Sequence, residues 1–153
     1  MKSKNAILLC LVVATLFVAF SCDKPIENGE DEPKYDIFEN HDVSACGIND
    51  PLQNIAWLKD YCKSLKEKQD FSSVRIDLYK AIDTDEHFFK IDIAYSEFDN
   101  SPYGYTVDWR NCVGECLIGL CSGVPPSPEA EERYEEFLKD KEYIIKLFYF
   151  IKR

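Results

Sequence analysis

The sequence predicts an α+β domain in which a helix, a four-stranded antiparallel meander and a C-terminal helix follow one another, with the helices packed on one sheet face. Three observations carry this prediction. Apolar residues recur at helical spacing in residues 51–68, they alternate with polar residues from about 74 to 121, and helical spacing returns from residue 128. Because the alternating segments are joined by short connections, neighbouring strands are expected to pair antiparallel.

The first helix is expected to begin at Asp50 and Pro51. An aspartate carboxylate can cap free helix amides, and proline suits the first helical position because its missing N–H would be unpaired there anyway. The apolar stripe of this helix consists of Leu52, Ile55, Leu58, Cys62 and Leu65. Trp57 flanks the stripe, so a half-buried packing role is expected for it.

The four strands and the last helix follow from the same patterns. The alternating residues are Val74, Ile76 and Leu78, then Phe89, Ile91, Ile93 and Tyr95, then Tyr103, Tyr105, Val107 and Trp109, and last the segment 116–121. Gly114 predicts a tight hairpin turn before the fourth strand. Ser127 and Pro128 are expected to cap and open the C-terminal helix, whose apolar stripe continues to Ile151 with a bend after Asp140.

Residues 1–21 are typical of a targeting segment. Lys2 and Lys4 make a basic start, and residues 6–20 form a charge-free apolar stretch that is short for a bilayer span. Ala-Phe-Ser precedes Cys22, and this resembles the lipobox of bacterial lipoproteins. The expectation is cleavage before Cys22 and a lipid anchor on that cysteine.

The composition of residues 22–45 predicts an acidic flexible tether, and residues 46–153 are expected to form a single domain. The tether segment has two prolines, a glycine, many carboxylates and few apolar groups. Acid directly after a lipidated cysteine resembles the export signal of Bacteroidota surface lipoproteins, so the expected location is the outer membrane or cell surface. Without residues 1–21 the chain would carry 16 basic and 28 acidic residues, a net charge of −12, which disfavours nucleic acid as a partner.

Cysteine usage predicts disulfides. Cys10 would leave with the targeting segment and Cys22 would carry lipid, which leaves five cysteines in the domain: Cys46, Cys62, Cys112, Cys116 and Cys121. In an oxidising compartment this allows at most two disulfides and one free thiol. Cys62 is expected to be the free one because it lies on the apolar helix stripe. Cys46 is then expected to pair with Cys112, Cys116 or Cys121.

Neither a metal nor a cofactor is expected. Three and four residues separate the last three cysteines, whereas zinc knuckles have two, and His41 and His87 lie far from them in sequence. Nothing beside a cysteine suggests a lowered thiol pKa.

Two segments carry a family resemblance. In GINDPLQNIAWLKDYCKSL, residues 47–65, the Asp50-Pro51-Leu52 step precedes a Trp57-Leu58-Lys59 helix, and WRNCVGEC, residues 109–116, places an aromatic strand before a turn and a cysteine. Both are similar to a group of small uncharacterised lipoproteins of the Bacteroidota. The resemblance implies an envelope location and an α+β fold, and it implies no catalytic residue.

The leading functional prediction is a binding module for an unknown protein or glycan that performs no catalysis. Aromatic side chains on a sheet face give a large contact area for little ordering entropy, and the candidates are Tyr79, Phe98, Tyr103 and Tyr105. One alternative is a small hydrolase that uses paired carboxylates such as Asp92 and Asp108 on neighbouring strands. Another is an inhibitor-like protein that acts on another enzyme.

Overall fold

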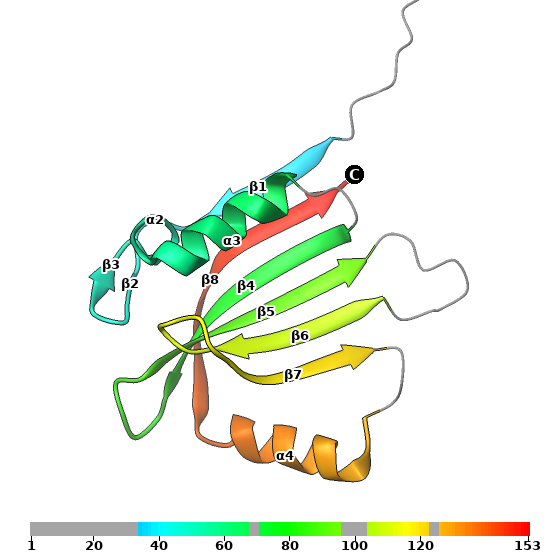
Figure 1. Ribbon diagram of the computed structural model, residues 1–153. Helices are drawn as coiled ribbons and strands as arrows, with labels where there is room; N and C mark the ends of the chain where they lie inside the picture. The colour runs from blue at the N-terminus through cyan, green and yellow to red at the C-terminus, as the bar shows by residue number, and fades with distance from the viewer. Residues whose placement is uncertain (1–33, 68–70, 96–103, 123–125) are drawn as a thin grey trace, which may run out of the picture. The chain divides into compact units, whose positions relative to one another are not determined.

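The computed structural model describes residues 34–67, 71–95, 104–122 and 126–153. In these residues, six strands form one antiparallel sheet in the order β1-β8-β4-β5-β6-β7, and two short strands form a separate hairpin (Figure 1). In chain order the elements are β1 (Tyr35–Glu39), β2 (Ser44–Ala45), β3 (Ile48–Asn49), α2 (Pro51–Asn54), α3 (Ala56–Glu67), β4 (Phe71–Ala81), β5 (His87–Tyr95), β6 (Tyr105–Arg110), β7 (Cys116–Ser122), α4 (Pro128–Leu138) and β8 (Lys141–Lys152).

The predicted four-stranded meander with a long C-terminal helix is wrong. Strands β4 to β7 do pair in chain order, but the described part of the chain is mostly β, and β8 occupies residues that were expected to continue the last helix. Ser127 caps α4 as predicted, its hydroxyl accepting a hydrogen bond from the Ala130 amide, yet α4 ends at Leu138. The segment KEYIIKLFYFIK that follows is rich in aromatic and β-branched residues, which fit a strand better than a helix.

The expected tether to residue 45 is also too long. Strand β1 pairs with β8 from Tyr35 opposite Lys152 to Glu39 opposite Phe148, and the Tyr35 ring lies 4.7 Å from that of Phe150. An acidic, half-exposed segment can take this place because β1 is an edge strand, paired on one side alone among the described strands. The folded unit therefore begins before Cys46.

The main core lies between the sheet and helices α2 and α3. Leu58, Cys62 and Leu65 of α3 are buried against apolar residues of β4, β5 and β8. Figure 1 shows α3 running along the sheet. The predicted single helix is two, since Ile55 is extended and separates α2 from α3. Asp50 does not cap α2 with its side chain: its φ of 49° lies in the left-handed region, whereas an N-cap residue is usually extended.

Helix α4 packs on the opposite face of the sheet from α3. Its residues Tyr134, Phe137 and Leu138 cover Phe88 and Trp109, and the Trp109 Nε1 donates a hydrogen bond to the Tyr134 hydroxyl at 3.1 Å. Phe88 precedes Phe89, which belongs to the α3 cluster, and successive residues of a strand point to opposite faces. The expectation that both helices cover one face is therefore wrong.

A disulfide joins the turn between β2 and β3 to the β6–β7 turn. Cys46 and Cys112 are bonded, as one of the predicted pairings, and the Trp57 Nε1 donates to the Cys112 carbonyl at 3.0 Å. Gly114 has a φ of +88°, and a Cβ there would lie 2.7 Å from the Trp57 ring, so this turn requires glycine. Cys62 is free and buried, and burial raises the pKa of its thiol to about 12.

Candidate functional site

Charged side chains occupy the centre of the sheet face opposite α3. Strand β4 alternates, so Val74, Ile76 and Leu78 join the core while Arg75 and Asp77 point the other way. The strand register places Arg75 opposite Asp92 of β5, and it places Asp77 between Lys90 of β5 and Lys146 of β8. We call this group the charged sheet face, and its members are Arg75, Asp77, Lys90, Asp92, Tyr105 and Lys146.

Asp77 is buried within this face. Its side chain is 2% exposed, and its Oδ2 accepts a hydrogen bond from the Arg75 Nε at 2.7 Å. Its other oxygen, Oδ1, is buried and has no hydrogen-bond partner in the structure. A buried carboxylate is stabilised by a hydrogen-bonded cation, so Asp77 fixes the position of the Arg75 side chain, and this contact raises the pKa of Arg75.

Asp92 organises the neighbouring part of the face. Its Oδ2 accepts a hydrogen bond from the Lys90 Nζ at 3.0 Å, and its Oδ1 accepts one from the Tyr105 hydroxyl at 2.7 Å. Burial, and then the contact with Asp92, raises the pKa of Tyr105, so the phenol stays neutral and donates a proton to this bond. Both oxygens of Asp92 are therefore occupied, and Lys90 and Tyr105 are held in fixed positions.

Aromatic rings surround the charged groups. The Lys146 Nζ lies 5.4 Å from the Phe38 ring centroid and 5.1 Å from that of Tyr149. The Tyr79 ring lies 4.6 Å from the Trp109 ring, tilted by 60° to it, and 5.5 Å from the Tyr143 ring in an edge-to-face contact. Phe38 is 44% exposed and Tyr143 50% exposed, so aromatic surface is open to a ligand on both sides of the charges.

The predicted site residues are partly brought together. Tyr79 and Tyr105 both lie on the face opposite α3, and strand alternation predicted this position for Tyr79. Phe98, Tyr103 and Cys22 lie outside the described residues. The proposed hydrolase pair is separated, because Asp92 is opposite Val107 and Asp108 is opposite Ile91, which places the two carboxylates on opposite faces of the sheet.

The cysteines whose side chains the structure describes do not form a cluster for metal binding. Cys116 is a free, exposed thiol, and the side chain of Cys121 lies outside what the structure describes. In the described parts of the chain, no group of three or more histidine, cysteine, aspartate or glutamate side chains is placed to hold a metal ion. Among those same residues, no helix is long and apolar enough to cross a membrane.

Four members of the charged sheet face, Arg75, Asp77, Lys90 and Lys146, were not predicted from the sequence. The sequence of β4 and β5 did contain an indication of this face. The residues that alternate with the core residues are Arg75 and Asp77 in β4 and Lys90 and Asp92 in β5, and in the sheet each cation lies opposite a carboxylate of the other strand. The position of Lys146 on this face could not be predicted, because its segment was interpreted as a helix.

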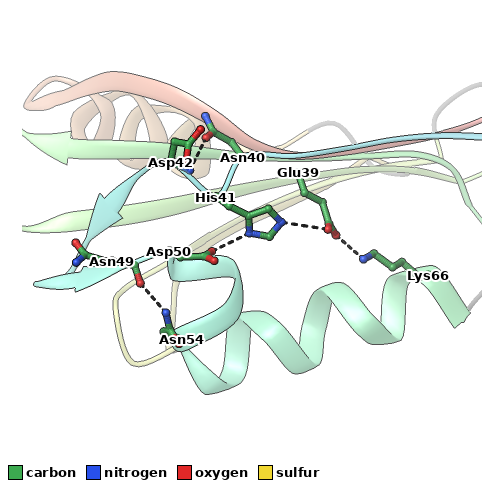
Figure 2. A network of polar contacts seen from close by, with 8 residues as sticks. All are labelled: Glu39, Asn40, His41, Asp42, Asn49, Asp50, Asn54 and Lys66. Carbon is green, nitrogen blue, oxygen red and sulfur yellow. Dashed lines mark hydrogen bonds and ion pairs between the residues drawn. The ribbon is translucent and has the colours of Figure 1, made fainter.

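A second polar network lies beside α2 (Figure 2). The His41 Nδ1 contacts the Asp50 Oδ1 at 2.9 Å, the His41 Nε2 lies 3.5 Å from the Glu39 Oε2, and Glu39 also pairs with Lys66 of α3. The hydrogen bond that His41 donates to Asp50, followed by the weaker influence of Glu39, raises the pKa of His41 from its ordinary value of 6.5. The network ties β1 to the two helices, and its exposed position indicates a structural role.

Replacing Asp50 by asparagine is expected to lower the pKa of His41 toward 6.5. A raised pKa means that the folded state favours the protonated imidazole, so the interaction is complete at pH values below 6.5 and is lost as pH rises through the folded-state pKa. Titration of the two histidine ring signals by NMR measures this, and His41→Gln assigns them. Asp42→Asn is the control, since Asp42 makes no side-chain contact with His41 in Figure 2, and an equal shift in that variant would contradict the assignment.

Comparison with protein-family models, with curated proteins and with solved structures found no match to this chain. A functional inference consequently depends on the geometry of the charged sheet face and on the sequence features of the first residues.

Proposed function

We propose that this protein is a cell-envelope lipoprotein, anchored at the outer membrane or cell surface through lipid on Cys22, whose domain binds a glycan on the charged sheet face without catalysis. The anchor is supported by the targeting segment, by the lipobox-like residues before Cys22 and by the resemblance to Bacteroidota lipoproteins. The glycan is supported by the chemistry of the face.

The observation that carries this proposal is the fixed polar network between open aromatic rings. Lys90 and Tyr105 are both held by Asp92, and Arg75 is held by Asp77, so the Lys90 and Arg75 donors and the Tyr105 hydroxyl oxygen, which can accept, are positioned before any ligand arrives. Preorganised donors lose little entropy on binding. A sugar ring offers hydroxyl groups to such donors and offers its apolar C–H surface to exposed rings such as Phe38 and Tyr143.

A protein ligand fits this face less well. The fully buried centre of a protein–protein interface is depleted of charged residues, and its charges lie in the rim. Here the order is reversed, because Arg75, Asp77, Lys90 and Asp92 occupy the centre and the aromatic residues Phe38 and Tyr143 lie outside them. A large apolar partner would therefore have to desolvate the charges first.

Binding to oligosaccharides tests the proposal. The purified full chain, immobilised on a sensor surface, is presented with a panel of neutral and acidic oligosaccharides. We expect at least one to bind and Tyr105→Ala to weaken that binding about tenfold, because the variant loses both a ring contact and a hydrogen-bonding hydroxyl.

The matched control is Leu117→Ala. Leu117 is 42% exposed and Tyr105 is 40% exposed, but Leu117 belongs to β7 and contributes no member of the charged sheet face. The Leu117→Ala variant should bind the oligosaccharide with the same affinity as the unaltered protein. If no oligosaccharide binds, or if the two variants weaken binding equally, the proposed function is wrong.

A further inference from the structure

Arg75 is held in a way that leaves part of its guanidinium group open. The Nε donates to the buried Asp77 Oδ2, while the Arg75 side chain as a whole is 48% exposed. A guanidinium has five N–H donors in one plane, of which the Nε uses one. Because the contact with Asp77 is made at Nε and the side chain is half-exposed, the Nη edge of the fork is the part that a ligand can reach.

The Asp77 carboxylate makes this arrangement rigid. An exposed arginine usually samples many rotamers, and fixing one of them costs entropy when a ligand binds. Asp77 is 2% exposed and lies in the middle of a six-stranded sheet, so it is a stationary acceptor. Its second oxygen, Oδ1, is buried and has no hydrogen-bond partner among the described residues. A carboxylate that lacks one of its hydrogen bonds contributes little to stability, and this fits a residue whose role is to orient the arginine.

The surrounding charge favours an anion. The charged sheet face holds three cations, Arg75, Lys90 and Lys146, against two carboxylates, although the whole chain has a formal net charge of −10. Lys90 is paired with Asp92, and Lys146 lies over aromatic rings. Arg75 is paired with Asp77, so in the described part of the chain the cation without a carboxylate of its own on this face is Lys146 of β8, the strand that lies beside β4 and Arg75.

We infer that the glycan carries a carboxylate on its sugar ring and that the Nη edge of Arg75 binds this carboxylate in a bidentate manner. The inference rests on the proposed function and names the ligand class within it. A planar carboxylate matches the guanidinium fork in shape as well as in charge. The acidic field of the rest of the protein repels densely charged polymers, so a single carboxylate per contact fits better than a highly sulfated chain.

The test compares an acid with its neutral ester on the unaltered protein. The probes are trigalacturonic acid and its methyl ester, which differ only in the carboxylate, and binding to the purified full chain is measured by calorimetry. We expect the acid to bind at least tenfold more tightly than the ester. A glutamate peptide and a sulfated trisaccharide are measured beside them, and both should bind more weakly than the acid.

Variants then assign the effect to Arg75. Arg75→Gln should abolish the preference for the acid over the ester, and Arg75→Lys should retain only part of it, because lysine offers charge without the fork. Asp77→Asn should reduce the preference even though it makes the face more positive, since the fork is no longer fixed. Lys63→Gln, which removes an exposed cation of α3, should leave the preference unchanged. Circular dichroism checks that each variant is folded.

The possible results separate the two proposals. Equal binding of acid and ester, tighter binding of the sulfated sugar or the peptide, or a preference that rises in Asp77→Asn would overturn the carboxylate inference and leave a glycan-binding face in place. Absence of binding to every saccharide in both panels would overturn both proposals together.

Discussion

Replacing Cys46 and Cys112 together by serine is expected to lower the free energy of unfolding by about 4 kcal/mol. The two cysteines are 66 residues apart in the sequence, and a cross-link over a loop of that length strongly restricts the unfolded chain. The effect is large beside the 5–15 kcal/mol that is typical of the total stability of a domain. Urea denaturation followed by tryptophan fluorescence measures it.

Two comparisons distinguish the loss of the cross-link from local effects at the cysteines. Cys46 has a φ of 57°, a strained conformation, but serine at this position would carry the same strain, so backbone strain cancels in the double variant. Cys116→Ser removes an exposed free thiol and should change stability by less than about 0.5 kcal/mol. Reducing the unaltered protein should reproduce the double variant, and full stability after reduction would show that the cross-link does not stabilise the fold.

Strands β4, β5 and β6 could be predicted because their alternation is regular, and β7 could be predicted because a turn at Gly114 precedes it. Each has one face in an apolar cluster, so apolar side chains recur at every second residue, as in Val74, Ile76 and Leu78. Strand β8 lacks this regularity. Its register with β4 shifts between Ile76 and Asp77 and again between Leu78 and Tyr79, and each shift breaks the twofold pattern.

The same irregularity explains why β8 was interpreted as a helix. Leu147 and Phe148 are consecutive and both are fully buried, which a regular strand with one buried face does not allow. Adjacent apolar residues are common in a helix stripe, so the C-terminal apolar residues fitted helical spacing as well. Strand β1 was not predicted for a different reason, since Ile37 and Phe38 are exposed at the sheet edge and lie in an acidic segment.

The charged sheet face could be predicted only in part. Alternation alone placed Tyr79 opposite the core, and the same reasoning applied to Arg75 and Asp77 would have placed them there too. The burial of Asp77 could not be deduced, because it depends on β8 lying beside β4. Because β8 was predicted to be a helix, the burial of Asp77 was not predicted, and this burial distinguishes the charged sheet face from an ordinary solvated face.

Replacing Phe148 by alanine is expected to lower the free energy of unfolding by about 3–5 kcal/mol. Phe148 is fully buried in the α3 cluster, opposite Ile76 of β4 and Glu39 of β1, so the truncation leaves a cavity in the middle of the sheet. Urea denaturation of the full chain measures the loss, with the unaltered protein as reference.

Ile144→Ala is the matched variant, because it separates the observed strand from both simpler arrangements. Residues 144 and 148 would share one face of a helix, being four apart, and they would also share one face of a regular strand, being an even number apart. The register shift at Leu147 lies between them instead, Ile144 is itself the residue skipped at the second shift, and Ile144 is 43% exposed. We therefore expect Ile144→Ala to cost less than about 1 kcal/mol, since a half-exposed side chain loses little buried surface. Equal losses in the two variants would contradict the irregular pairing of β8 with β4, on which the burial of Asp77 depends.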